Sequence, residues 1–224
     1  MPPFLLPAPW QVLQAAQKDA VLLWGHMLVS LQEAFLGLAL SITAAFVLAI
    51  LMDRFAWLEE MTLPLLTLSQ TIPVIALAPL LVLWFGYGLF PKIILIFLVC
   101  FFPLAVGLLA AFKEVDRDIL RLMTSMGASY WQSLWHVKLP AALPAFFTGL
   151  RIAVSYAIIG AVIAEWLGGD SGLGVYMTRV RKSYSFDSMF AVIIIVSFIS
   201  LALIWLVEFL EKKAMPWQRI HQDK

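Results

Sequence analysis

Residues 93–112 read IILIFLVCFFPLAVGLLAAF, a run of twenty residues without a charged side chain. An α-helix of about 20 apolar residues crosses the hydrocarbon core of a bilayer, whereas a strand of a membrane β-barrel needs only about ten residues of alternating pattern. The run shows no such alternation. It therefore predicts a membrane-spanning α-helix.

Four more segments have the same character. Three of them are uncharged throughout: residues 34–52, 61–91 and 188–207. The fourth lies between Pro144 and Gly169, and its charged residues, Arg151 and Glu165, stand near its two ends, from which long side chains reach an interface or a polar interior. The sequence therefore predicts an all-α fold, a polytopic transmembrane bundle of five spans that forms a single domain over residues 1–224.

Composition agrees with a protein embedded in the bilayer. Of the 224 residues, 62% are apolar and 13% are charged, against roughly 25% charged in an average soluble domain. The net charge of +1 gives no basis for a nucleic-acid partner. The single cysteine, Cys100, excludes an intrachain disulfide, and His26, His136 and His221 lack the spacing of a metal site. The sequence therefore predicts neither a metal site nor a catalytic site.

The distribution of Lys and Arg predicts the orientation of the bundle, because these residues are retained on the cytoplasmic side. One side of the predicted spans carries Arg54, Lys113, Arg117, Arg121, Lys138, Arg151, Lys212, Lys213, Arg219 and Lys224. The other side carries Lys18, Lys92, Arg179, Arg181 and Lys182. We therefore predict a cytoplasmic region at 113–140 and a cytoplasmic tail at 211–224. An external or interfacial segment at 1–27 precedes a helical core at 28–210.

Residues 20–37 are only partly apolar, since Gln32 and Glu33 interrupt them. This pattern predicts a helix that lies in the interface before the chain enters the membrane. Glu33 allows two interpretations. It is either an interfacial or helix-capping carboxylate, or a charge that faces a pore, because ionisable groups at membrane depth are costly and are kept for a function.

The second uncharged run contains Pro64, Pro73 and Pro79 and is predicted to be kinked, because proline removes a backbone hydrogen bond. Gln70 and Thr71 precede the middle proline. Together with Pro73 they either line a translocation pathway, where water satisfies the freed carbonyls, or bond to a neighbouring helix. The sequence leaves both interpretations open.

Residues 127–140, GASYWQSLWHVKLP, form a polar insert between two apolar spans. Gly127 is suited to a sharp bend. Ser129 and Gln132 have the Ser-x-x-Gln spacing of a capping box, in which each side chain bonds a free amide at the start of a helix. The spacing predicts a short helix that begins there.

Trp131, Leu134 and Trp135 fall at helical spacing on one face of this short helix. Pro140 and Pro144 are expected to stop it from running straight into the next span. An amphipathic helix of this kind either floats at the membrane surface, where tryptophan is favoured, or is presented to a cytoplasmic partner.

The polar insert resembles the coupling loop of permease subunits of binding-protein-dependent ABC importers, with Gly127, Val137, Leu139 and Pro140 at that family's spacing. Further matches are Pro79-Leu80, Trp84-Phe85-Gly86, Phe102-Pro103, Ala141-Ala142-Leu143-Pro144, Phe147-Thr148-Gly149-Leu150-Arg151, Ala164-Glu165-Trp166-Leu167-Gly168 and Gly172-Leu173-Gly174. They cover most of residues 28–210. The chain is most similar to the branch that includes sulfonate, taurine, nitrate and thiamine-precursor permeases. One stretch departs from the family: Arg121-Leu122-Met123 stands where Glu-Ala-Ala is common.

The resemblance implies a transport subunit that forms the translocation pathway for a small polar solute and is not itself an enzyme. A short cytoplasmic coupling helix would dock on a separate ATPase subunit, which uses ATP and Mg, while this chain binds no cofactor. The sequence agrees, because it lacks the G-x-x-x-x-G-K-S/T phosphate loop. The docking residues so implied are Gly127, Ala128, Ser129, Trp131, Gln132, Leu134, Trp135, Val137, Leu139 and Pro140.

The same resemblance implies an external substrate-binding protein, a homodimer, contact with lipid, and a multi-pass location in the bacterial cytoplasmic (inner) membrane. The family usually has six spans, and Leu6-Pro7-Ala8-Pro9 looks like the stretch that follows the first of them. The chain is therefore expected to start after that helix.

Glu165 and Trp166 lie near the outer end of their span. They are predicted either to shape an outer gate or to meet the binding protein, with satisfaction of Glu165 by another helix as the alternative. The basic loop with Arg179, Arg181 and Lys182 is either a second contact with that protein or a solvated connection.

The transported solute is only weakly indicated. Residues 69–73 and 83–88 look most like members that carry pyrimidine precursors of thiamine. Sulfonates, taurine and nitrate remain alternatives, because the binding protein selects the substrate. A transporter of another class, driven by an ion gradient, also remains open, because Glu33 and Glu165 at membrane depth are compatible with it.

Overall fold

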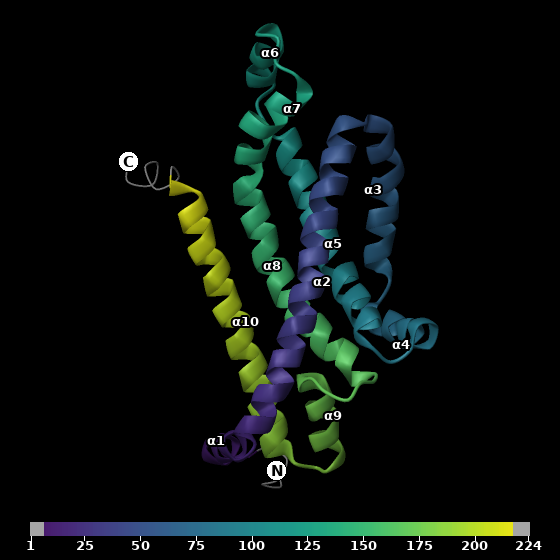
Figure 1. Ribbon diagram of the computed structural model, residues 1–224, viewed down its shortest axis with the longest axis vertical. Coiled ribbons are helices and arrows are strands. Elements are labelled where there is room, and N and C mark those ends of the chain that lie inside the picture. The colour runs from purple at the N-terminus through teal and green to yellow at the C-terminus, as the bar shows by residue number, and fades with distance from the viewer. Residues whose placement is uncertain (1–6, 217–224) are drawn as a thin grey trace.

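The computed structural model describes residues 7–216, and among these every regular element is a helix (Figure 1). In chain order the helices are α1 (Pro9–Lys18), α2 (Ala20–Arg54), α3 (Ala56–Thr71), α4 (Val74–Phe85), α5 (Leu89–Lys113), α6 (Arg117–Ser125), α7 (Tyr130–Ser133), the π-helix η1 (Leu134–Lys138), α8 (Leu139–Trp166), α9 (Leu173–Lys182) and α10 (Phe186–Ala214).

Four of these helices are long and apolar enough to cross a membrane: α2, α5, the continuous helix Tyr130–Trp166, and α10. The pair α3 and α4 adds a fifth if the two are counted as one broken span, bent by 97°. The all-α polytopic bundle predicted from the apolar runs is confirmed.

The break between α3 and α4 lies at one of the three prolines of the second run. Ile72 is extended, with φ −82° and ψ 120°, and Pro73 caps α4. A residue before proline is driven out of the helical region by a clash with the proline ring. Pro64 and Pro79 are accommodated inside α3 and α4. The predicted kink is therefore confirmed.

The centre of the bundle is built from α2, α5 and α8, with α5 packed against both of the others. Small side chains permit this close packing, as is usual between membrane helices. Ala45, Ala105 and Ala153, one from each helix, have no exposed surface. A Cβ added at Gly37 of α2 would stand 2.5 Å from Ile96 of α5, so only glycine allows that approach.

The two ends of the bundle carry different elements (Figure 1). The segments α6 and α7 lie at one end, together with the start of α3, and α10 rises toward the same side. At the opposite end lie α1 and α9. The polar insert and the α1–α9 side thus lie at opposite ends of the bundle, and which of these ends is cytoplasmic stays a prediction. Residues 1–6 and 217–224, which include part of the predicted external segment and most of the predicted tail, fall outside the described range.

The predicted interfacial helix at 20–37 is wrong. These residues continue without a break into the span, so that α2 has 35 residues and a length of about 52 Å. Within this stretch His26, Ser30 and Glu33 are buried against other helices, whereas Gln32 is exposed.

Candidate functional site

The polar insert begins with the local structure that its sequence predicts. Gly127 has φ +80°, in the left-handed region that favours glycine. Ser129 then caps α7: its Oγ accepts a hydrogen bond from the Gln132 amide at 3.3 Å, and Gln132 Oε1 accepts one from the Ser129 amide at 2.7 Å. The predicted capping box is confirmed, and it fixes where the short helix starts.

The apolar residues of the insert do not share one face, contrary to the prediction. Leu134 is completely buried in the central core, whereas Trp131 and Trp135 are 59% and 65% exposed. The short helix packs against the bundle on one side, so Leu134 is drawn inward and the two tryptophans are left outward. The exposed Trp131 and Trp135 are a surface suited to a protein partner.

Pro140 and Pro144 do not end the helix, and that prediction is also wrong. One helix runs from Tyr130 to Trp166. Its turn at Leu134–Lys138 is a π-helix, in which the amide of Leu139 bonds to the carbonyl of Leu134. The π turn brings Pro140 into the first turn of α8, where a proline is tolerated. The insert is therefore continuous with the span that follows.

The remaining predicted docking residues follow the same division between exposed and packed sides. Gly127, Ser129, Gln132 and Pro140 are exposed, and Ala128, Val137 and Leu139 are partly buried. Sequence reasoning missed the residue that holds them in place, which is Asp53 at the end of α2. Its carboxylate bonds to Lys138 at the end of the π-helix. No local pattern links two residues 85 positions apart.

The predicted pathway residues Gln70, Thr71 and Pro73 are all exposed at the break between α3 and α4. Thr71 Oγ1 donates to the carbonyl of Leu68 in its own helix at 2.8 Å, not to a neighbouring helix. Gln70 lines a cavity of about 320 Å³ that it shares with Tyr156 of α8. The structure therefore brings Gln70 and α8 to one surface, while Glu165 and Trp166 lie elsewhere.

Glu165 is buried at the outer end of α8, with 1% of its surface exposed. Its Oε1 accepts a hydrogen bond from Ser30 Oγ of α2 at 2.6 Å, and its Oε2 accepts one from the Gly174 amide of α9 at 2.6 Å. Of the interpretations that the sequence left open for Glu165, the structure therefore shows the one in which other helices supply hydrogen bonds to the carboxylate. Trp166, in contrast, is 45% exposed.

The turn between α8 and α9 closes over the same carboxylate. Gly172 has φ +123°, and a Cβ added there would overlap the Glu165 carboxyl group. The Gly172 amide donates to His26 Nδ1 at 2.9 Å, and the Leu173 amide donates to Ser30 Oγ at 2.8 Å. We call His26, Ser30 and Glu165, with the three amides of residues 172–174, the outer polar cluster.

Glu33 fits neither of its predicted interpretations. Its Oε1 accepts a bond from Lys92 of α5 at 2.6 Å, and both side chains are buried. Pairing reduces the cost of placing two charges in a medium of low dielectric constant. The pair therefore joins α2 to α5 and presents no charge to a pore.

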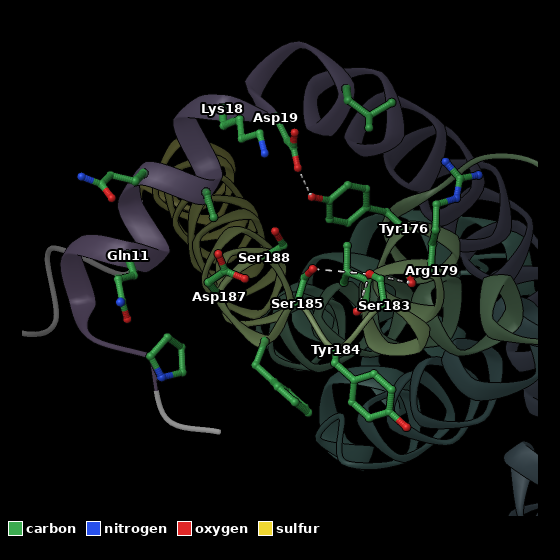
Figure 2. Close-up of a pocket in the computed structure, with 16 residues that line it drawn as sticks. Gln11, Lys18, Asp19, Tyr176, Arg179, Ser183, Tyr184, Ser185, Asp187 and Ser188 are labelled. Carbon is green, nitrogen blue, oxygen red and sulfur yellow. Dashed lines mark hydrogen bonds between the residues drawn. The ribbon is translucent and has the colours of Figure 1, made fainter. Parts of the chain in front are cut away.

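An open pocket of about 880 Å³ lies at the outer end, between α1, α9 and the start of α10 (Figure 2). Lys18, Arg179 and Asp187 line it together with several hydroxyl groups. On its wall, Tyr176 donates a hydrogen bond to Asp19 Oδ2 at 2.6 Å, and burial together with this bond raises the pKa of Tyr176 to about 12. The pocket is lined by charges of both signs.

Comparison with known proteins defines the class of this chain. The family of inner membrane components of binding-protein-dependent transport systems matches residues 37–215. The formylaminopyrimidine transport permease protein ThiX of Halalkalibacterium halodurans is 39% identical over 97% of this chain and 87% of its own length. The taurine transport system permease protein TauC of Escherichia coli is 33% identical over 96% of this chain and 81% of its own length.

Solved structures agree in fold. The structure of an amino acid ABC transporter with histidines superposes with a TM-score of 0.75 at 15% identity, covering 89% of this chain and 97% of that one. An inward-facing structure of the methionine ABC transporter MetNI gives a TM-score of 0.69 at 18% identity, covering 93% of this chain and 98% of that one.

The chain belongs to the family of binding-protein-dependent transport system inner membrane components. It is a multi-pass permease subunit of an ABC importer in the bacterial inner membrane, within the branch of sulfonate, taurine and thiamine-precursor permeases. This membership separates it from the ion-gradient-driven class that the sequence had left open.

Proposed function

We propose that this subunit pairs with a second copy of itself to form the translocation pathway for a small polar solute. Cytoplasmic ATPase subunits supply the energy with ATP and Mg, and an external binding protein delivers the solute; this chain binds no cofactor and catalyses no reaction. The observation that carries the proposal is the polar insert. It is a short, capped helix that exposes two tryptophans and runs without a break into a membrane span.

The continuity of the insert with α8 supports a role in coupling. A cytoplasmic subunit that binds Trp131 and Trp135 would displace the end of a 37-residue helix. Because that helix reaches the outer polar cluster through Glu165, movement at one end is conveyed to the other. Alternating access requires two such arrangements of the bundle, selected by the state of the partner.

The broken span supports the pairing of two copies. Gln70 and Thr71 are exposed within the second uncharged run. Polar groups facing lipid are costly, and irregular backbone at membrane depth is tolerated where protein or water covers it. A second copy packed over the break, around the cavity shared with Tyr156, would provide that cover and enclose the pathway between the two subunits.

For the solute, we propose a pyrimidine precursor of thiamine, because the relative of 39% identity is a formylaminopyrimidine permease. Taurine and sulfonate permeases at 33% and 31% identity support the alternative substrates, with nitrate retained from the same branch. Uptake into proteoliposomes, measured with the binding protein and each radiolabelled solute in turn, separates these. Saturable, ATP-dependent uptake of the pyrimidine alone supports the first choice, and uptake of taurine or a sulfonate alone replaces it.

Coupling is tested by co-purification. The chain is co-expressed with its ATPase subunit and isolated in detergent as wild type and as Gly127→Asp, which places a charge at the bend before α7. We expect the variant to lose the ATPase. Gly86→Asp is the matched control, because Gly86 has a similar φ of +77° and equally open surroundings away from the insert. Equal recovery of the ATPase with Gly127→Asp and wild type would contradict docking at the insert.

A further inference from the structure

Asp53, in the last turn of α2, contacts the polar insert at both ends of its helix. Lys138 Nζ lies 2.7 Å from each of the two carboxylate oxygens of Asp53. The Tyr130 hydroxyl donates to Asp53 Oδ2 at 2.8 Å. Tyr130 is the first residue of α7 and Lys138 the last of the π-helix. The one carboxylate of Asp53 is therefore bonded to residues at both ends of the short helix.

The contact is shielded from water and reinforced. The side chains of Lys138 and Asp53 are 13% and 5% exposed. The Arg54 guanidinium lies over the Tyr130 ring, 4.9 Å from its centroid, and Leu134 between the two contacts is fully buried. A shielded ion pair resists separation, because losing one partner leaves a buried charge without compensation. The insert cannot turn relative to α2 without breaking these bonds.

The other end of α2 is attached just as firmly. In the outer polar cluster, Ser30 accepts a hydrogen bond from the Leu173 amide and His26 accepts one from the Gly172 amide. Between Ser30 and Asp53 the helix is uninterrupted and contains no proline. The same rigid helix is thus bonded to the polar insert on one side of the membrane and to the turn before α9 on the other.

We propose that Asp53 is a positioning residue for energy coupling: it fixes the polar insert to α2, so that displacement of the insert moves α2 together with α8 and reaches the outer turn through both helices. The covalent link to α8 alone would allow the insert to swivel at its π turn. The ion pair between Asp53 and Lys138 prevents this rotation. This inference rests on the proposed role of the insert as the ATPase contact.

The test uses the complete transporter in proteoliposomes, with the ATPase subunits and the binding protein, and measures solute uptake per ATP hydrolysed. For Asp53→Asn we expect the ATPase to remain bound and to hydrolyse ATP, while uptake per ATP falls about 5-fold or more, the range of coupling between linked sites. Glu59→Gln is the matched control. Glu59 pairs with Lys113 at the same end of the bundle but does not contact the insert.

A rescue experiment separates positioning from general damage. The exchange Asp53→Lys with Lys138→Asp restores the ion pair and is expected to recover uptake per ATP, which loss of folding would not permit. Tyr130→Phe removes only the hydroxyl bond and is expected to give a smaller fall. It provides the same comparison if Asp53→Asn does not accumulate.

Three results would contradict either the role of Asp53 in coupling or the proposed function. Uptake per ATP unchanged in both Asp53→Asn and Tyr130→Phe overturns the inference. Loss of the ATPase from Asp53→Asn, with retention by Glu59→Gln, also overturns it, because Asp53 would then serve docking and not transmission. Failure of the wild-type chain to retain the ATPase would instead refute the proposed function.

Discussion

The two ends of the bundle use α2 in the same way but present opposite surfaces. At the end that carries the polar insert, Asp53 holds a short helix whose tryptophans are exposed. At the outer end, Ser30 and Glu165 hold a glycine turn that fits against them without spare room. At the first end the short helix is fixed on the side that packs against the bundle, and its other side is exposed to solvent, as a docking surface requires. The second is closed, so changes there should act on the fold before they act on transport.

Gly172→Ala should have the largest effect. The added Cβ overlaps the Glu165 carboxyl group, and φ of +123° is strained for any L side chain. We expect destabilisation on the order of 3 kcal/mol or more, since steric overlap and backbone strain combine. Thermal unfolding of the purified subunit in detergent measures it. Gly127→Ala, strained but in open space at the other end, should lose much less. Equal losses would remove the contrast between the two ends.

Glu165→Ala should come next, because it leaves the buried Gly174 amide without its acceptor and leaves the Ser30 hydroxyl only the longer bond to the His26 carbonyl, at 3.2 Å. Unpaired buried polar groups cost about 1–3 kcal/mol each. We expect a lower melting temperature and reduced accumulation in the membrane. Glu60→Ala provides the control, since Glu60 is an exposed glutamate near the cytoplasmic end. A fully stable Glu165→Ala subunit that fails only in transport would return Glu165 to the predicted gate.

Trp131→Ala and Trp135→Ala should show the reverse pattern, with stability retained and the ATPase bound more weakly. Tryptophan is enriched among the few interface residues whose truncation costs about 2 kcal/mol or more. The affinity for the purified ATPase, measured with the subunit in nanodiscs, reports the loss. Trp24→Ala, at the outer end and 61% exposed, is the control. Unchanged affinity in both variants would show that the partner does not bind the tryptophan side.

Ser129→Ala should have the smallest effect. It removes half of the capping box and costs about 1 kcal/mol of helix stability. Hydrogen exchange should be faster at the first amides of α7 and unchanged at the outer turn. If the whole insert exchanged freely, the cap and not Asp53 would be what holds the insert in place.

The sequence by itself determined what depends on local pattern. Uncharged runs of sufficient length specify membrane helices, since the bilayer leaves their backbone no other way to satisfy its hydrogen bonds. Pro73 set a break through its effect on the residue before it, and Ser129 with Gln132 set the start of a helix. Each of these depends on neighbours a few residues away, so a single chain read in order is enough.

Only the tertiary structure decided which polar groups meet. Glu33 bonds to Lys92, Ser30 to Glu165 and Asp53 to Lys138, and the partners are 59, 135 and 85 positions apart in the sequence. No period or spacing encodes these pairs, because they depend on how α2, α5 and α8 are rotated about their axes when their small residues pack. That packing also buried Leu134. The chain stays helical past the expected stop at Pro140, which follows the π-helix and lies in the first turn of α8, since the energy of a filled core outweighs a local preference for ending the helix.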